Sequence, residues 1–188
     1  MTTENNKNKH LKRILLIGSP GSGKTTILSE LRKRGYTCFK EVSREIILEA
    51  QARGIEQLFL TNPDEFNEKL LSGRIAQFKA CENIDNDYAF IDRGLPDIIA
   101  YNEYINVTSA PEVIQASKEL VYDFVFLFPA WKAIFKNDNE RYESFEEALK
   151  IQDNLKKTYT KYGYEVCEVP VGDISDRSNY ILNVVEYS

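Results

Sequence analysis

Histidine is nearly absent from this chain, which has 188 residues and a single histidine, His10. Because His10 lies in a polar N-terminal stretch, catalysis that depends on an imidazole base is nearly excluded. Cysteine is also scarce. Cys38, Cys81 and Cys167 are widely spaced among apolar residues, which favours reduced core thiols over disulfides or a metal site.

Long apolar runs are missing as well. No segment reaches the roughly 18 apolar residues of a membrane span, and the N-terminus has no apolar signal-peptide core. We therefore expect a cytoplasmic protein with a disordered tail at 1–10 and one domain at 11–188. A net charge of −5 disfavours a nucleic-acid partner or an anionic membrane. Whether the protein is a monomer or a homodimer stays open.

Segment 18–25 reads Gly-Ser-Pro-Gly-Ser-Gly-Lys-Thr and fits the P-loop pattern G-x-x-x-x-G-K-[ST] at every position. Apolar residues 14–17 precede it and residues at helical spacing follow it, so it lies at a strand-to-helix turn. In such a loop the backbone N–H groups surround phosphates, Lys24 bridges the outer phosphates and Thr25 takes one Mg²⁺ position. The predicted nucleotide contacts are Gly18, Pro20, Gly21, Ser22, Gly23, Lys24, Thr25 and Thr26.

Apolar segments of strand length alternate with helical patterns from Leu11 onward. This alternation predicts an α/β fold with three layers and a five-stranded, mostly parallel sheet. The expected strands are 12–17, 36–41, 88–92, 122–128 and 164–170, with the last at an edge. Helix starts are predicted at Asn62, at the capping boxes Ser109–Glu112 and Ser144–Glu147, and at Asp173.

Strand 88–92 ends in Asp92, which we predict to be the second Mg²⁺ ligand beside Thr25, because P-loop proteins place a carboxylate where an apolar strand ends next to the loop. An alternative and compatible role for Asp92 is to cap the following helix. Arg93 lies at the carboxyl edge of the sheet, where open α/β folds bind ligands. We place Arg93 and Asp97 in the substrate site, although Arg93 would equally pair with Asp97 four residues on.

The end of the second strand also carries charge. A carboxylate there would face the γ-phosphate across the cleft, so Glu41 is predicted as a general base or substrate anchor, with Arg44 one turn further on. The alternative is a solvated charged turn. On the helix after Asn62, Gln77 is a weaker substrate-site candidate and Arg74 another, because most polar residues on a helix form its exposed face.

A polar, turn-rich stretch follows the fourth strand and ends at Ser144, a pattern typical of a mobile lid. Arg141 would enter the site as the lid closes and would neutralise charge on the transferred phosphoryl group. The alternative is an ordinary basic loop. After the fifth strand, Arg177 lies where many P-loop kinases seat the nucleotide base, and it is predicted to stack there.

In order, these segments resemble the family of AAA-type predicted ATPases related to the ribosylnicotinamide kinase domain of the bacterial NAD regulator. The resemblance covers the chain from Arg13 onward. Glu41 after the second strand and Asp92-Arg93 after the third are also similar to the arrangement in deoxynucleoside kinases, where the glutamate acts as base and the Asp-Arg pair serves metal and phosphate. This similarity implies kinase chemistry and the strand order 2-3-1-4-5.

We therefore expect a phosphotransferase that uses ATP or GTP and Mg²⁺ and acts on an unidentified small, nucleoside-like acceptor. Its catalytic residues would be Lys24, Glu41, Asp92 and Arg141. The alternative is a slow nucleotide-dependent switch that binds a protein or lipid partner. A nucleic-acid-dependent ATPase is disfavoured by the acidic composition. No guanine-reading Asn-Lys-x-Asp tetrapeptide is present, which favours ATP.

Overall fold

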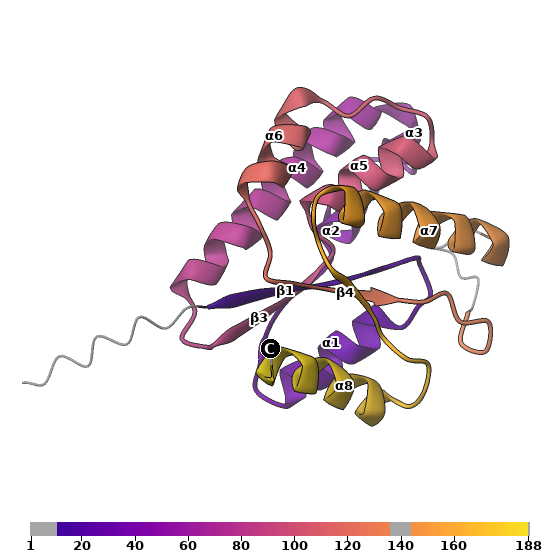
Figure 1. The fold of residues 1–188 in the computed structure, drawn as a ribbon. Coiled ribbons are helices and arrows are strands. Elements are labelled where there is room, and N and C mark those ends of the chain that lie inside the picture. The colour runs from indigo at the N-terminus through magenta and orange to yellow at the C-terminus, as the bar shows by residue number, and fades with distance from the viewer. Residues whose placement is uncertain (1–10, 136–143, 188) are drawn as a thin grey trace, which may run out of the picture.

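The computed structural model of the chain describes residues 11–135 and 144–187 (Figure 1). Within them, five strands form one sheet in which every pairing is parallel, in the order β2-β3-β1-β4-β5. This confirms the predicted α/β class and strand order. The strands are β1 (Lys12–Gly18), β2 (Thr37–Phe39), β3 (Tyr88–Asp92), β4 (Phe124–Phe128) and β5 (Val166–Glu168).

Helices connect the strands and cover both faces of the sheet (Figure 1). Among the described residues, the connection from β2 to β3 contains more helices than any other connection: α2, α3, α4 and a short 3₁₀ helix, η1, all lie between these two strands. The helices are α1 (Lys24–Lys33), α2 (Val42–Ala52), α3 (Leu58–Thr61), α4 (Pro63–Ala80), η1 (Cys81–Asn83), α5 (Leu95–Tyr104), α6 (Pro111–Glu119), α7 (Phe145–Lys161) and α8 (Ile174–Glu186).

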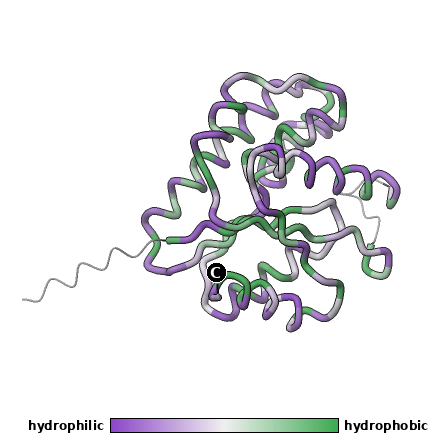
Figure 2. Tube along the Cα trace, viewed as in Figure 1, coloured by the Kyte–Doolittle hydropathy of each residue, from purple (hydrophilic) through white to green (hydrophobic). Residues whose placement is uncertain are grey.

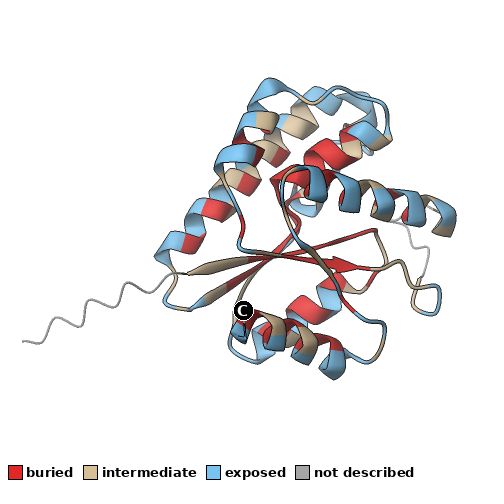
Figure 3. Cartoon of the chain, in the orientation of Figure 1, coloured by how far each residue is buried: buried red, intermediate tan, exposed pale blue. Residues whose placement is uncertain are grey.

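Alternate residues of the central strands build two separate cores, because successive side chains of a strand point to opposite faces. On β1, Ile14 and Leu16 pack with apolar residues of α1 and α8, whereas Leu15 and Ile17 pack with residues of α4, α5 and α7. The central strands are therefore apolar on both faces, and they are the most hydrophobic and most buried part of the chain (Figures 2 and 3).

A third apolar cluster lies away from the sheet and joins α2, α3, α4, α5 and α6. Val42, Ile46, Leu58, Leu70 and Ile98 belong to it and are all buried. These helices lie together on one side of the sheet, opposite α1 and α8 (Figure 1).

The predicted central strands agree closely with the structure, but the two edge strands are shorter than expected. The predictions 36–41 and 164–170 correspond to only Thr37–Phe39 and Val166–Glu168. Both strands have a neighbour on one side only, so the ladder has no second partner to extend them.

Three of the four predicted helix caps are present. The side chains of Asn62, Ser144 and Asp173 each accept a hydrogen bond from a backbone N–H in the first turn of their helix. The capping box at Ser109 was wrong, because Pro111 is the first residue of α6 and the N-cap is therefore Ala110. In the described part of the chain, no helix has both the length and the apolarity needed to cross a membrane.

Candidate functional site

The P-loop connects β1 to α1 and depends on glycines at three points. Gly18, Gly21 and Gly23 have φ values of +145°, +77° and +91°, which side chains with a Cβ rarely adopt. A Cβ at Gly18 would lie 2.5 Å from the carbonyl oxygen of Phe128, and one at Gly23 would lie 2.8 Å from Nη1 of Arg177. The loop is therefore held in its curled shape by both backbone conformation and neighbouring groups.

Lys24 folds back over this loop. Its Nζ donates to the carbonyl oxygens of Gly18 at 2.9 Å and Ser19 at 3.0 Å, and to Oγ of Ser22 at 3.3 Å. Burial, followed by the charge of Arg93, lowers the pKa of Lys24 to about 8. The ammonium thus lies in the centre of the loop, where it would meet incoming phosphate oxygens.

Asp92, the last residue of β3, is 4 % exposed, and its Oδ1 is buried without a hydrogen-bond partner. Burial, followed by the nearby charge of Glu41, raises the pKa of Asp92 to about 6. Buried carboxylate oxygens are normally satisfied, and a carboxylate is a hard oxygen ligand of the kind that Mg²⁺ prefers. The unsatisfied oxygen fits the predicted metal position, and Asp92 is not the cap of α5, whose N-cap is Gly94.

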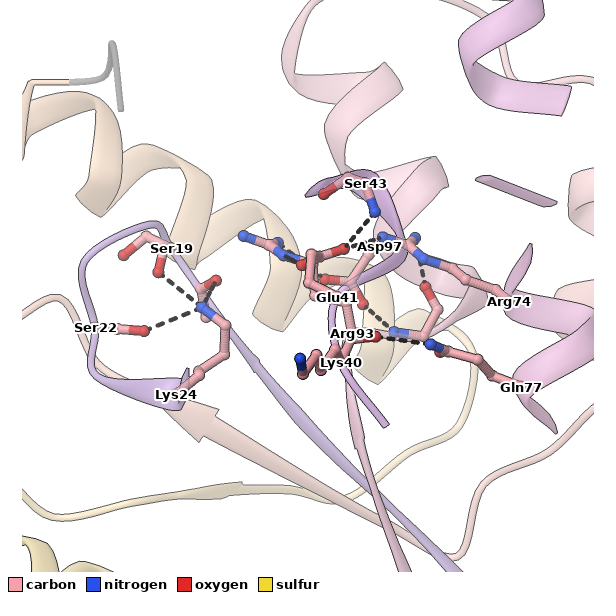
Figure 4. A network of polar contacts seen from close by, with 12 residues as sticks. Ser19, Ser22, Lys24, Lys40, Glu41, Ser43, Arg74, Gln77, Arg93 and Asp97 are labelled. Atoms are coloured by element: carbon pink, nitrogen blue, oxygen red, sulfur yellow. Dashed lines mark hydrogen bonds and ion pairs between the residues drawn. The ribbon is translucent and has the colours of Figure 1, made fainter. Parts of the chain in front are cut away.

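Four charged side chains from three parts of the chain, Glu41, Arg74, Arg93 and Asp97, meet in one cluster (Figure 4). Glu41, the N-cap of α2, pairs through Oε2 with Nε of Arg93 and through Oε1 with Nη2 of Arg74 at 3.2 Å. Arg93 also pairs with Asp97 at 3.2 Å. Burial opposes ionisation of Glu41, but Arg93 and Arg74 together bring its pKa below the usual value. The glutamate is a buried, ionised group that faces the cavity.

Arg93 has an unusual backbone, with φ of +67°, one of two non-glycine residues with positive φ in the described chain. Its backbone N–H donates to the carbonyl of Leu16 at 3.1 Å, and its guanidinium lies 5.0 Å from the centre of the Tyr101 ring. Strain of this kind is common at functional sites. Asp97 is fully buried and both of its oxygens accept hydrogen bonds from the protein. These contacts orient Arg93, and Asp97 also belongs to the lining of the cavity described below.

Arg177, near the start of α8, lies against the other side of the P-loop. Its Nη2 donates to the carbonyl of Ser22 at 3.2 Å, and its guanidinium lies 4.7 Å from the Phe128 ring and 5.8 Å from the Trp131 ring. Burial lowers its pKa. Arg177 is thus packed against the P-loop beside the half-buried Trp131, and its stacking on a nucleotide base stays a prediction.

One cavity of about 1090 Å³ connects these groups. At one end it is lined by residues 20–27 of the P-loop and α1, and by residues 172–175 and Arg177. Glu41, Arg44, Asp92 and Arg93 line its middle. Its far end is mostly apolar and aromatic and includes Ile47, Leu48, Phe59, Leu60, Phe66, Asn67, Ile98, Tyr101, Asn102 and Ile105.

The cavity brings together most of the predicted site residues. Of the nucleotide contacts, only Gly18 is not in its lining, and Arg44 is exposed at its wall. Gln77 lies elsewhere: its Nε2 donates to the carbonyl of Lys40 at 2.7 Å, outside the lining (Figure 4). Arg141 lies outside the described residues, as does most of the predicted lid.

Arg74 was underestimated. It is 4 % exposed, and it pairs with Glu41 and donates to the carbonyl of Gly94 at 2.7 Å. A sequence signal was available, because Arg74 lies midway between Leu70 and Phe78 at four-residue spacing, on the buried face of α4. The aromatic residues at the far end of the cavity gave no comparable signal.

Similar folds occur among solved structures. Deoxyadenosine kinase from M. mycoides with bound dATP has a TM-score of 0.65 and 20% identity, over 93% of this chain and 99% of that one. Thymidylate kinase from Candida albicans has a TM-score of 0.69 and 16% identity, over 95% and 92%. NadR in complex with NR has a TM-score of 0.65 and 18% identity, over 95% of this chain and 50% of that one. These TM-scores show that the chain shares the fold of these P-loop kinases.

A comparison with curated proteins finds no match. A family model described as an AAA domain matches residues 13–177, which is most of the chain and includes the P-loop, Glu41, Asp92 and Arg177. On that match, and in agreement with the resemblance noted in the sequence, this chain belongs to the AAA domain family.

Proposed function

We propose that the protein is a Mg²⁺-dependent kinase that transfers the γ-phosphoryl group of ATP to a hydroxyl of a small, nucleoside-like acceptor. The observation that carries this proposal is the single cavity: it has a P-loop at one end, an aromatic wall at the other, and an ionised, arginine-paired glutamate between them. A protein that only hydrolyses or senses nucleotide does not need the aromatic end of the cavity, which lies beyond the nucleotide site.

At the nucleotide end, residues 20–26 would bind the phosphates through backbone N–H groups and Lys24. Thr25 and the unsatisfied Oδ1 of Asp92 would hold Mg²⁺. The described residues contain no group of three or more His, Cys, Asp or Glu side chains arranged to hold a metal ion, so phosphate oxygens and water would complete the metal's ligands. When bound, Mg²⁺ neutralises charge on the phosphate oxygens.

In the middle of the cavity, Glu41 would accept a hydrogen bond from the acceptor hydroxyl and orient its oxygen towards the γ-phosphorus. A new bond forms between that oxygen and phosphorus while the bond to the bridging oxygen of the leaving diphosphate breaks. The hydroxyl proton passes to Glu41. Arg93, Arg44 and Lys24 supply positive charge around the transferred group.

The far end of the cavity supports a planar acceptor. Phe59 and Phe66 lie 6.1 Å apart between ring centres, and Tyr101 lines the same compartment. Asn67 donates to Asn102 at 3.3 Å within this wall, so amide groups are available among the rings. Aromatic walls with a few polar groups are typical of small-molecule sites. The dATP-bound deoxyadenosine kinase has a similar fold, which supports a nucleoside as the first acceptor to test.

The experiment measures transfer of label from γ-labelled ATP or GTP to each member of a nucleoside panel, with and without Mg²⁺. Glu41→Gln should lower kcat by about 10²–10⁴-fold and leave nucleotide affinity unchanged. Glu45→Gln is the matched control, because Glu45 is exposed one turn further along α2.

No labelled acceptor, together with hydrolysis that Glu41→Gln leaves unchanged, would contradict the kinase and favour a nucleotide-dependent switch.

A further inference from the structure

Tyr159 on α7 contacts the charged cluster of Glu41, Arg74, Arg93 and Asp97 through Asp97. It is fully buried, and its hydroxyl donates to Oδ2 of Asp97 at 2.5 Å. The same carboxylate accepts the backbone N–H of Gly94 at 2.8 Å through Oδ2 and pairs with Arg93 through Oδ1. Burial, and then the adjacent Asp97, raise the pKa of Tyr159 well above its usual value, so the phenol keeps the proton that it donates.

Gly94 leaves the space that this contact needs. A Cβ at that position would stand 2.9 Å from the hydroxyl oxygen of Tyr159 and 2.5 Å from Cδ1 of Leu15. The φ of Gly94 is −124°, a value that any residue adopts. Glycine is therefore required here for room rather than for conformation, and the space that it leaves is taken by the Tyr159 hydroxyl and the end of the Leu15 side chain.

Two hydrogen bonds connect α7 to α5 near Tyr159 and Asp97. Nδ2 of Asn154 donates to the carbonyl of Ala100 at 2.6 Å, and Oγ1 of Thr158 donates to Glu103 at 3.2 Å. These bonds fix the position of α7 along α5, and with it the distance from Tyr159 to Asp97. The hydroxyl is thus held on its target by two helices.

Resting on the proposed function, we propose that Tyr159 is a positioning residue for phosphoryl transfer: through Asp97 it holds Arg93, and through Arg93 it holds Glu41 in place. The chain of contacts runs from Tyr159 to Asp97, from Asp97 to Arg93, and from Arg93 to Glu41.

Two further features explain why this support is needed. The backbone of Arg93 is strained at φ of +67°, so the side chain needs a fixed partner to stay in this conformation. On the opposite side, Arg74 binds both Glu41 and the carbonyl of Gly94. Without the Tyr159 hydroxyl, Asp97 would keep fewer partners and Glu41 would be anchored mainly by Arg74.

The test compares Tyr159→Phe with Tyr164→Phe. Tyr164 is the matched control because its ring packs 5.4 Å from that of Tyr159, while its hydroxyl accepts the backbone N–H of Tyr122 instead of touching Asp97. Tyr159→Phe should lower kcat by about 10-fold or more and leave the KM for ATP unchanged. Tyr164→Phe should leave both unchanged. Asp97→Asn should reproduce the fall, and adding Tyr159→Phe to it should change kcat little further.

A second readout needs no turnover. In the ligand-free protein, the ¹⁵N–¹H signal of Arg93 Nε, assigned by its loss in Arg93→Lys, should shift or broaden in Tyr159→Phe and stay in place in Tyr164→Phe. If wild type transfers no phosphate, the proposed function fails while this spectrum still tests the contact. An unchanged Arg93 signal, with or without a fall in kcat, assigns Tyr159 a packing role and overturns the positioning proposal.

Discussion

Asp92 interacts electrostatically both with Lys24 of the P-loop and with Glu41 and Arg93 of the charged cluster. It lies at the end of β3, next to Arg93, and shares the cavity with Lys24, Thr25 and Glu41. Its raised pKa arises from burial first and from the charge of Glu41 second. In the ligand-free protein at pH 7 this ionised carboxylate is therefore a destabilising group, and a bound cation would offset that cost by pairing with it.

We predict that Asp92→Asn stabilises the ligand-free protein at pH 7 while it abolishes the effect of Mg²⁺ on nucleotide binding. The pKa rises from 3.8 to about 6, and two pH units correspond to about 3 kcal/mol as an order of magnitude. Urea unfolding in EDTA measures the gain, and calorimetric titration of ATP with and without Mg²⁺ measures the loss. Asp153→Asn, on the exposed side of α7, is the control for both.

The same shift fixes the sign of the pH dependence. Between about pH 4 and 6 the folded protein binds more protons at Asp92 than the unfolded chain does, so the stability from this group is present at low pH and is lost as pH rises through about 6. The advantage of Asp92→Asn should therefore disappear near pH 4. An equal advantage at pH 4 and pH 7 would contradict this explanation.

A site residue could be predicted from the sequence where its signal comes from residues next to it in the chain. The P-loop was readable because its eight positions are contiguous, and Asp92 because it ends an apolar strand. Arg74 was only a weaker candidate, since no local pattern says that an arginine on this helix will meet a carboxylate 33 residues earlier in the chain. The Arg93–Asp97 pair, one of two alternatives for Arg93, is present, but the other partner of Asp97, Tyr159, is 62 residues away.

At the scale of single elements, one neighbouring residue can decide which residue becomes the N-cap of a helix. Ser109 and Ser144 carry the same sequence signal, a serine with glutamate three residues on. Ser144 accepts the N–H of Glu147 at 3.2 Å, and Glu147 accepts the N–H of Ser144 at 2.7 Å. Ser109 instead accepts a hydrogen bond from Asn102 at 3.1 Å, because Pro111 sets the start of α6 one residue later.

We predict that Ser144→Ala destabilises the protein by about 1 kcal/mol, the usual effect of losing an N-cap. Ser109→Ala should have a smaller effect, because it removes a side-chain contact and no cap. Chemical denaturation of both variants measures the difference. If the two losses were equal, or if Ser109→Ala were the more harmful, the cap assignment of α6 would be wrong.

At the scale of the whole molecule, α2 and α4, which both carry residues of the cavity lining, approach each other closely. A Cβ at Gly73 of α4 would lie only 2.5 Å from Cγ1 of Val42, the first residue of α2. Glu41 is the N-cap of α2, and Arg74 follows Gly73. The close approach of these helices therefore sets the distance across the Glu41–Arg74 pair.

We predict that Gly73→Ala destabilises the protein by a net amount of up to about 2 kcal/mol. Overpacking costs about 1–3 kcal/mol, since the β-branched Val42 has little freedom to move away, and the helix propensity of alanine over glycine offsets roughly 1 kcal/mol of this cost. In a Val42→Ala background the clash is absent, so Gly73→Ala should become stabilising by about 1 kcal/mol. Urea unfolding of the four proteins measures the coupling, and the same sign in both backgrounds would contradict this packing.

The sequence alone determined the phosphate-binding loop, the central strands, most helix starts and the family, because each depends on residues that are close together in the chain. Only the tertiary structure decided which partners the charged residues have in the other half of the site. Glu41, Arg74, the Arg93–Asp97 pair and Tyr159 come from four separate parts of the chain, and their meeting depends on how α2, α4, α5 and α7 pack together. Ion pairs and close contacts between distant segments leave no periodic mark in a sequence, whereas a loop made of consecutive residues does.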